Sequence, residues 1–369
     1  AFVVPVFAAN RCASLKAKGL LISSTPAAQA DEALQKLRDY GWEAESNLLH
    51  ASHIAFEVAP AVTVTFANAL ARASVQDHLC GFSFGSTTAQ GLPNALAAGL
   101  PTMAATGNGV PPAGGVQLIN NLSPGAALRD MFSFSPSTLA QDWNLDGALC
   151  LRNLLTGTDA AARALQAGLD ATRRTGKLGG KPAIIVHGRN DALLPVNHTS
   201  RPYTALSMLA DGSASKLSYI EVTNAQHFDG FIGLPAVLPG YDTRFVPLHL
   251  VLNRALDAVY AHLKNGTPLP PSQVLRTTPR GGTPGAAPAL TAANVPAFAT
   301  TPARKRKWSA MIGPAQLILP VTDAIGGCSL WPAMRNFWPP LSTRVTPCNW
   351  PRKSRCHQSR RNSPSVRLR

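Results

Sequence analysis

The order of elements between residues 181 and 230 constrains the fold more than any other feature of the sequence. An apolar run at 183–187 predicts a buried strand, residues 200–209 have a helical pattern, and a second apolar run follows at 217–222. Strands that alternate with helices belong to parallel sheets, because the helix carries the chain back across one face of the sheet before the next strand begins. We therefore predict an α/β fold with a parallel sheet in this part of the chain.

One ionisable side chain follows each of these two predicted strands. Asp191 lies in the polar turn of KPAIIVHGRNDALLPV, and His227 lies in the loop TNAQHFDGF. Loops that follow neighbouring parallel strands meet at the same edge of the sheet. A carboxylate bonded to one imidazole nitrogen leaves the other nitrogen free to take a proton from a hydroxyl. The sequence thus predicts a catalytic pair in which Asp191 orients His227; the alternative is a turn-capping acid and a surface histidine.

A pair of this kind also needs a nucleophile, and GFSFG at 81–85 matches the GxSxG pattern of α/β-hydrolases. The chain order Ser83, Asp191, His227 is the order of that fold. However, a nucleophile elbow follows an apolar strand and opens a helix, and the residues around Ser83 predict neither. Ser83 is therefore a weak candidate, and the identity of the nucleophile stays open.

Other polar residues near the predicted pair have simpler interpretations. Asp229 is expected to stabilise its loop by accepting hydrogen bonds from backbone N–H groups. His198 and Arg201 are expected in a solvated loop, with the alternative that Arg201 binds a substrate carboxylate.

Helical patterns dominate the chain upstream of the predicted sheet. Residues 84–142 are rich in Gly, Pro, Ser and Thr and predict long loops with short elements. The segment after residue 265 is rich in Pro and Gly and is expected to lie along the surface. The predicted helices are 24–42, 59–73, 145–155, 159–174 and, beyond the two strands, 244–264.

The formal net charge of +15 comes mainly from the end of the chain. Residues 302–369 have a net charge of +12 and residues 1–301 only +3. The body of the protein therefore lacks the excess of basic residues that a nucleic-acid-binding surface requires. The basic segment itself predicts either a nucleic-acid or import signal or an out-of-frame translation, and we expect it to be disordered.

The cysteines do not have the spacing of a zinc site. Cys12, Cys80 and Cys150 are scattered through the body, and we expect them to be small buried hydrophobic residues rather than a disulfide framework. The first residues, AFVVPVFAANRC, lack the basic start of a signal peptide, and no apolar run reaches the roughly 20 residues that span a bilayer. We expect a soluble chain that does not enter a membrane.

From about residue 12 to residue 298, the chain resembles the D-(-)-3-hydroxybutyrate oligomer hydrolase family, also called hydroxybutyrate-dimer hydrolases. The segments that carry the resemblance are ADEALQKLRDYGWE, ATGNGVPP, NLDGALCLR, GKPAIIVHGRNDALLPVNHTSRPY, EVTNAQHFD, PGYDTRFVPLH and GTPLPPSQVLRTTPRGGTPGAAPALTAANVP.

The resemblance implies an extracellular serine esterase of the α/β-hydrolase fold that cleaves short 3-hydroxybutyrate oligomers, a small-molecule ester substrate, without a metal or cofactor. Asp191 and His227 correspond to the acid and the base. The family's serine lies in an upstream Ser-x-Ser-x-Gly box that this sequence lacks, and family chains are longer at the amino end. We therefore expect a carboxyl-terminal fragment without the nucleophile, inactive by itself.

This interpretation divides the chain into four regions. They are a remnant of the upstream hydrolase core at 1–20, a helical and loop-rich, cap-like insertion at 21–180, the carboxyl-terminal half of the core at 181–301, and the basic tail at 302–369.

Two other functions stay open. Tannases and feruloyl esterases resemble this chain around the acid and the histidine but have cysteines immediately before both, where this chain has Asn190 and Gln226. The other alternative is a non-catalytic binding protein with a basic tail, built on a hydrolase remnant.

Overall fold

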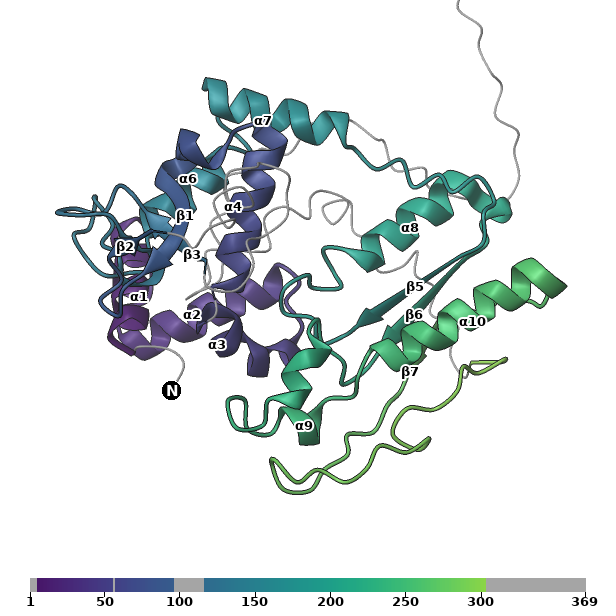
Figure 1. Cartoon of the computed structure of the whole chain (residues 1–369). Helices are drawn as coiled ribbons and strands as arrows, with labels where there is room; N and C mark the ends of the chain where they lie inside the picture. Colours follow the sequence, from purple (N-terminus) through teal and green to yellow (C-terminus); the bar gives the residue numbers. More distant parts are fainter. Residues whose placement is uncertain (1–4, 56, 96–115, 303–369) are drawn as a thin grey trace, which may run out of the picture.

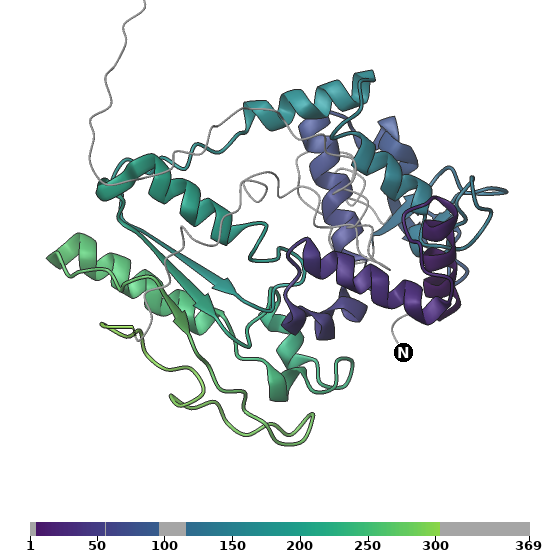
Figure 2. The same ribbon diagram turned by 180° about the vertical axis from the view of Figure 1, so that it is seen from behind.

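The computed structural model describes residues 5–55, 57–95 and 116–302. These residues form two parts that lie side by side (Figure 1). One part contains the helices of the first half of the chain and a small antiparallel sheet. The other contains a parallel sheet with a helix on each face. The view from behind shows the same division, with residues 172–182 leading from the first part to the second (Figure 2). The predicted tail, apart from Pro302, lies outside the described residues.

The first part begins with helices that the sequence predicts in part. Helix α2 matches the predicted helix at 24–42: the Thr25 hydroxyl oxygen caps it by accepting a hydrogen bond from the Ala28 N–H, and Pro26 occupies the first position. Helix α3, which the sequence did not predict, lies between two predicted helices. The bounds are Pro5–Ala17 for α1, Pro26–Asp39 for α2, Asn47–Ala55 for α3 and Val58–Ala71 for α4.

The small antiparallel sheet lies in the region for which the sequence predicted loops with short elements. Its strand order is β2-β1-β3-β4, and Ser83 of β1 pairs with Ile119 of β3. The short elements are therefore the strands of one sheet. Their bounds are Phe82–Thr87 for β1, Pro93–Asn94 for β2, Gln117–Asn120 for β3 and Leu128–Arg129 for β4.

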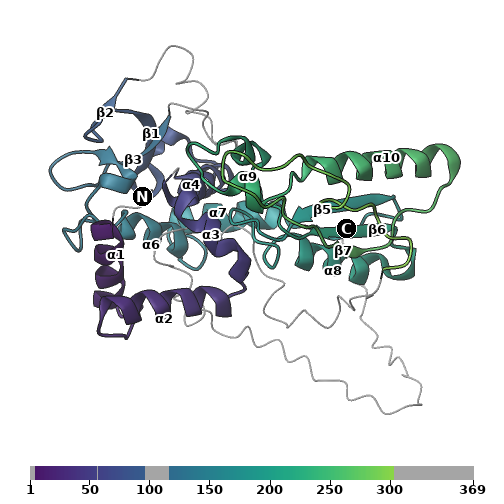
Figure 3. The same cartoon turned by 90° about the horizontal axis from the view of Figure 1, so that it is seen from below.

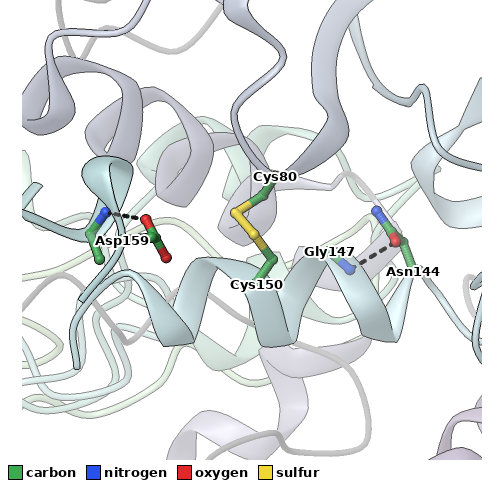
Figure 4. The surroundings of a disulfide bond; sticks show 6 residues. Cys80, Asn144, Gly147, Cys150 and Asp159 are labelled. Carbon is green, nitrogen blue, oxygen red and sulfur yellow. Dashed lines mark hydrogen bonds between the residues drawn. A yellow bond between two sulfur atoms is a disulfide. The ribbon is translucent and has the colours of Figure 1, made fainter. Parts of the chain in front are cut away.

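Two helices complete the first part, α6 (Leu145–Asn153) and α7 (Ala160–Ala171). Each begins with a polar side chain whose oxygen accepts a backbone hydrogen bond, from the Gly147 N–H to Asn144 at 3.0 Å and from the Ala162 N–H to Asp159 at 2.9 Å (Figure 4). Both helices contribute to one hydrophobic core with α1, α2, α4 and the antiparallel sheet.

A disulfide joins Cys80, just before β1, to Cys150 in α6 (Figure 4). The expectation that these two cysteines are simple buried hydrophobic residues is therefore wrong. The two cysteines are 70 residues apart in the sequence, and their spacing alone does not show that the fold brings them together. Cys12, buried in the same core, is also disulfide-bonded, so the expectation is wrong for all three cysteines of the body.

The second part contains the predicted parallel sheet. Strands β5 (Ala183–Gly188) and β6 (Leu217–Val222) pair in parallel along their whole length, from Ala183 opposite Leu217 to Gly188 opposite Val222. Helices α8 (Ser200–Asp211) and α10 (His249–Asn265) lie on opposite faces of the sheet (Figures 1 and 3). A short helix, α9 (Tyr241–Arg244), precedes α10.

A third strand, β7 (Gln273–Leu275), extends the sheet beyond β6. The sequence predicted only an extended surface segment there, and the order β5-β6-β7 makes β6 the central strand. All six residues of β6 are buried, whereas β5 is mostly half-buried. Among the described residues, β5 pairs only with β6, so its other edge has no strand beside it.

No helix in the described ranges combines the length and the apolar character that crossing a bilayer requires.

Candidate active site

The ends of β5 and β6 bring the predicted pair together. A glycine at the end of β5 allows the two loops to touch: a Cβ atom at Gly188 would lie 2.5 Å from the carbonyl oxygen of Ala225. Two backbone hydrogen bonds then tie the loops, from the Arg189 N–H to Val222 at 2.8 Å and from the Asn190 N–H to Ala225 at 2.9 Å.

The two predicted site residues are in direct contact. Nδ1 of His227 lies 2.8 Å from Oδ2 of Asp191 and donates a hydrogen bond to it. The Asp191 side chain is 5% exposed and the His227 side chain 30% exposed, so the carboxylate is buried behind an accessible ring. The described residues offer no hydrogen-bond partner for Nε2 of His227, which leaves this atom for a reacting hydroxyl.

Asp191 accepts hydrogen bonds at both carboxylate oxygens. Its Oδ1 atom accepts from the backbone N–H groups of Leu193, at 2.9 Å, and Leu194, at 2.7 Å. Its Oδ2 atom is shared by His227 and by His187, whose Nε2 lies 3.2 Å away. Burial alone would raise the pKa of Asp191, but the hydrogen bonds from the two imidazoles outweigh burial and hold the pKa well below its ordinary range. Asp191 is therefore a carboxylate over the whole physiological range.

The same contact acts in the opposite direction on His227. Partial burial favours the neutral ring and lowers its pKa, but the hydrogen bond to Asp191 and the charge of that carboxylate raise the pKa above its ordinary value, with a net upward shift. A base stabilised as the imidazolium is suited to take a proton during a reaction.

Two histidines near the pair were missed by the sequence interpretation. His187 is the next-to-last residue of β5. The turn after β5 brings Asp191 back beside His187, and a hydrogen bond from the Asp191 N–H to the Gly188 carbonyl at 3.1 Å closes this turn. His53 of α3 is buried, and its ring centroid lies 5.8 Å from that of Phe228. The ring centroid of Phe228 in turn lies 4.6 Å from that of His227. Their spacing from His227 in the chain gives no periodic signal, so only the fold reveals them.

Burial lowers the pKa of His53, against the opposing effects of its hydrogen bond to Leu49 and the charge of Asp191. The ring is therefore neutral and, with Phe228 and Phe231, forms an aromatic wall beside the pair.

Arg201 is neither solvated nor free to bind a substrate, so both interpretations of this residue are wrong. Its Nε and Nη2 atoms each donate to the buried carboxylate of Glu221 at 2.8 Å, and Arg189 donates to the same group at 2.6 Å. Burial would raise the pKa of Glu221, but the hydrogen bonds and charge of Arg201, and then those of Arg189, lower it to about 2. Arg201 also pairs with Glu43 of the first part.

The remaining neighbours have structural roles. The ring of His198 stacks on that of Tyr40 with centroids 5.0 Å apart, and its Nε2 lies 2.9 Å from the Tyr40 carbonyl oxygen, so it is not in a solvated loop. Asp229 accepts hydrogen bonds from the backbone N–H groups of Leu248 and His249, both at 2.7 Å, as the sequence predicts. These bonds fix the start of α10.

Ser83 lies away from the pair. It occupies the middle of β1 in the antiparallel sheet, in the other part of the molecule (Figures 1 and 3). Its hydroxyl oxygen accepts a hydrogen bond from the side-chain amide of Asn121 at 2.8 Å. β1 leads to β2 through a turn and not into a helix, so Ser83 is not at a nucleophile elbow.

No group of acidic, histidine and cysteine side chains in the described parts of the chain has the arrangement of a metal site. A small cavity of about 30 Å³ in the first part is lined by Arg11, Glu57 and Asp130, among others, and burial raises the pKa of Asp130 to about 8. Neither member of the predicted pair lines it.

A buried carboxylate that orients an accessible imidazole, at the carboxyl ends of neighbouring parallel strands, has the geometry that an acid–base pair of a hydrolase requires. The comparisons with known proteins agree with this class. The family model of the 3HB-oligomer hydrolases matches residues 1–312, and the chain belongs to this family. The resemblance recognised in the sequence is confirmed.

Three relatives, each named D-(-)-3-hydroxybutyrate oligomer hydrolase, illustrate the similarity. The protein of Paracidovorax citrulli is 67% identical over 304 residues, which are 82% of this chain and 43% of the relative. A protein of Ralstonia pickettii is 65% identical over 296 residues, 80% of this chain and 40% of the relative. That of Cupriavidus necator is 61% identical over 300 residues, 80% of this chain and 41% of the relative.

The chain thus spans less than half the length of the curated relatives it matches. No solved structure matches it.

Proposed function

We propose that this chain supplies the acid–base pair of a serine esterase that hydrolyses 3-hydroxybutyrate oligomers to monomers. The observation that carries the proposal is the 2.8 Å contact between Nδ1 of His227 and Oδ2 of the buried Asp191. The substrate class follows from the name of relatives that are 61–67% identical. Family membership favours this substrate over the esters of tannases and feruloyl esterases.

In the proposed reaction, Nε2 of His227 takes the proton of a serine hydroxyl as the oxygen attacks the ester carbonyl. The resulting imidazolium is stabilised by Asp191 and then gives the proton to the departing hydroxyl group of the product. A water molecule, activated by the same imidazole, releases the second product from the acyl-enzyme. Asp191 stays ionised throughout, because its pKa lies far below that of the imidazole.

The nucleophile is proposed to lie in the part of the relatives' length that this chain does not span. Two observations support this. Ser83 lies in the antiparallel sheet, and the edge of β5 has no strand beside it among the described residues. A parallel strand added at that edge, followed by a helix, would place an elbow serine at the same rim as His227. The proposed fold is then an α/β-hydrolase of which this chain forms the carboxyl-terminal part.

An extracellular location is proposed as well. Besides the family resemblance, its support is the disulfide between Cys80 and Cys150, because disulfides persist in oxidising compartments.

Replacing the matching part of the Paracidovorax citrulli relative by residues 1–302 of this chain tests the proposal. The chimera is expected to hydrolyse 3-hydroxybutyrate dimers. His227→Ala should lower kcat by about 10⁴-fold or more, and Asp191→Asn by about 10⁴-fold. His262→Gln is the matched control, since this half-buried histidine lies near the end of α10, where its ring contacts the Thr267 carbonyl and is no part of the proposed pair. An active His227→Ala chimera would contradict the proposal.

A fluorophosphonate probe tests where the nucleophile lies. We expect the probe to label the chimera and not this chain alone. Labelling of the folded chain that disappears in Ser83→Ala would instead make Ser83 the nucleophile.

A further inference from the structure

We infer that His187 is a positioning residue for the proposed acid–base pair, a second imidazole that shares the Oδ2 atom of Asp191 with His227 and is held in one tautomer by Ser200. The inference rests on the proposed function, because it assigns a role through the Asp191–His227 pair. The functional role of His187 is distinct from that of His227, since its ring has no free nitrogen to offer a substrate.

Both nitrogens of His187 have a partner. Nε2 lies 3.2 Å from Oδ2 of Asp191, and Nδ1 lies 2.6 Å from the hydroxyl oxygen of Ser200. The side chain is only 13% exposed, so solvent does not replace these partners. A carboxylate oxygen only accepts, so Nε2 must carry a proton for the contact with Asp191 to be a hydrogen bond.

When the ring is neutral, a proton on Nε2 leaves Nδ1 as an acceptor. The Ser200 hydroxyl is placed to donate to Nδ1. A single direction of donation therefore runs from Ser200 through His187 to Asp191. The Tyr219 hydroxyl lies 2.9 Å from the Ser200 oxygen and 3.3 Å from Oε2 of Glu221, and its one proton is placed to be donated to either oxygen. Burial, followed by the nearby charge of Glu221, raises the pKa of Tyr219, so its hydroxyl keeps this proton.

The charged groups around these hydrogen bonds balance one another. Glu221 of β6 lies 3.3 Å from the Tyr219 hydroxyl and is paired with Arg189, after β5, and Arg201 of α8. Glu43 pairs with Arg201 from the other side. Among the described residues, the other imidazoles beside the pair are His187, which shares Oδ2 of Asp191, and His53, which lies across Phe228 from His227. A change at His187 should therefore alter the pKa of His227 directly.

The physical effect of His187 follows from the shared oxygen. A neutral N–H donor at Oδ2 stabilises the carboxylate charge and weakens the attraction between that charge and a protonated His227. Removing the donor should strengthen this attraction and raise the pKa of His227. A residue that only fills space would leave the titration of His227 unchanged when a ring of similar shape replaces it.

The test uses the full chain and needs no catalytic activity. Histidine side chains are labelled with ¹⁵N and followed by NMR as the pH changes, with the signal of His227 assigned by its loss in His227→Gln. In the unaltered chain, the neutral ring of His187 should be protonated at Nε2 and not at Nδ1. The opposite tautomer would overturn the inference without any variant of His187.

Three variants sharpen the result. His187→Phe removes the donor and should raise the apparent pKa of His227 by about half a unit or more. His187→Gln, whose amide nitrogen can replace Nε2, should keep the pKa of His227 close to that of the unaltered chain. Ser200→Ala should shift it upward by less than His187→Phe does. If the pKa of His227 is unchanged in folded His187→Phe, the inference is overturned. If His187→Phe fails to fold, an unchanged pKa of His227 in folded Ser200→Ala overturns it instead.

The outcome is separable from that of the proposed function. If the chimera keeps its activity after His227→Ala, the proposed function fails, whereas the tautomer of His187 and the shift of His227 are measured in either case. If the function holds, the low-pH limb of kcat/KM in the His187→Phe chimera should move upward together with the NMR titration.

Discussion

At the scale of single residues, Gly188 determines how closely the two site loops approach. A methyl group at this position would meet backbone atoms of Ala225, which cannot move aside as a flexible side chain would. We expect Gly188→Ala to destabilise the chain by about 1–3 kcal/mol and to weaken the contact between Asp191 and His227. Urea unfolding and the NMR titration of His227 measure the two effects.

Gly230→Ala is the matched control, because a Cβ atom there would meet nothing within 4 Å. It should change stability by no more than about 0.5 kcal/mol. Equal effects of the two substitutions would show that the close approach of the loops does not require glycine.

The buried negative charge of Glu221 is stabilised by neighbouring arginines. It is fully buried and accepts hydrogen bonds from both Arg189 and Arg201. Glu221→Gln removes the charge and leaves these cations without their buried partner, so we expect a loss of roughly 3–5 kcal/mol in the free energy of unfolding. Glu43→Gln removes a partner of Arg201 that is 23% exposed, and its effect should be about 1 kcal/mol. Urea unfolding at neutral pH compares the two variants. Similar losses in the free energy of unfolding would contradict the expectation that Glu221 contributes more than Glu43.

At the scale of secondary structure, the disulfide connects the segment just before β1 to α6 in the first part. Replacing both Cys80 and Cys150 by Ser removes a link between positions 70 residues apart, and we expect the free energy of unfolding to fall by about 2–4 kcal/mol. The titration of His227 should be unchanged, because the link lies in the other part. An unchanged Tm would mean that the bond contributes little to this part; peptide mapping without reductant checks that the bond forms.

Elements with local signals could be predicted from the sequence, and those that depend on distant partners could not. Helix α2 has its cap, its proline and its apolar spacing within one segment, as β5 and β6 have their apolar runs. The strands of the antiparallel sheet are short and contain Gly and Ser, so the pairing with a distant strand defines them. The same holds for β7, three residues in a segment rich in proline that become a strand only beside β6.

The candidate site follows the same division. Asp191 and His227 could be predicted as neighbours, because parallel strands place successive loops at one edge. The contact of His187 with Asp191 depends on how the turn after Gly188 folds back, and that of His53 depends on the packing of α3, an element without a clear signal. The buried role of Arg201 likewise depends on Glu43, which comes from the other part of the chain.

At the scale of the whole molecule, the two parts are joined at the acid loop. The side-chain amide of Asn190 donates to the Glu45 carbonyl at 3.0 Å, and that of Asn197 donates to the Gly41 carbonyl at 2.7 Å. His198 adds its contact with Tyr40. The loop that carries Asp191 is therefore held between the sheet and the helical part, and movement of the helical part would be transmitted to the carboxylate.

The open edge of β5 leads to the last prediction, on how the whole sheet is completed. Among the described residues, the amide groups of β5 that point away from β6 have no strand to bond to, so in this chain alone they should exchange with solvent much faster than those of the central strand β6. In the chimera, a parallel strand at this edge should protect them, because sheet edges are stable only when paired or covered. Hydrogen exchange measured residue by residue over 183–188 compares the two proteins. Full protection of β5 in the chain alone would show that another segment of this chain already covers the edge, and the nucleophile strand would then have to enter the sheet elsewhere.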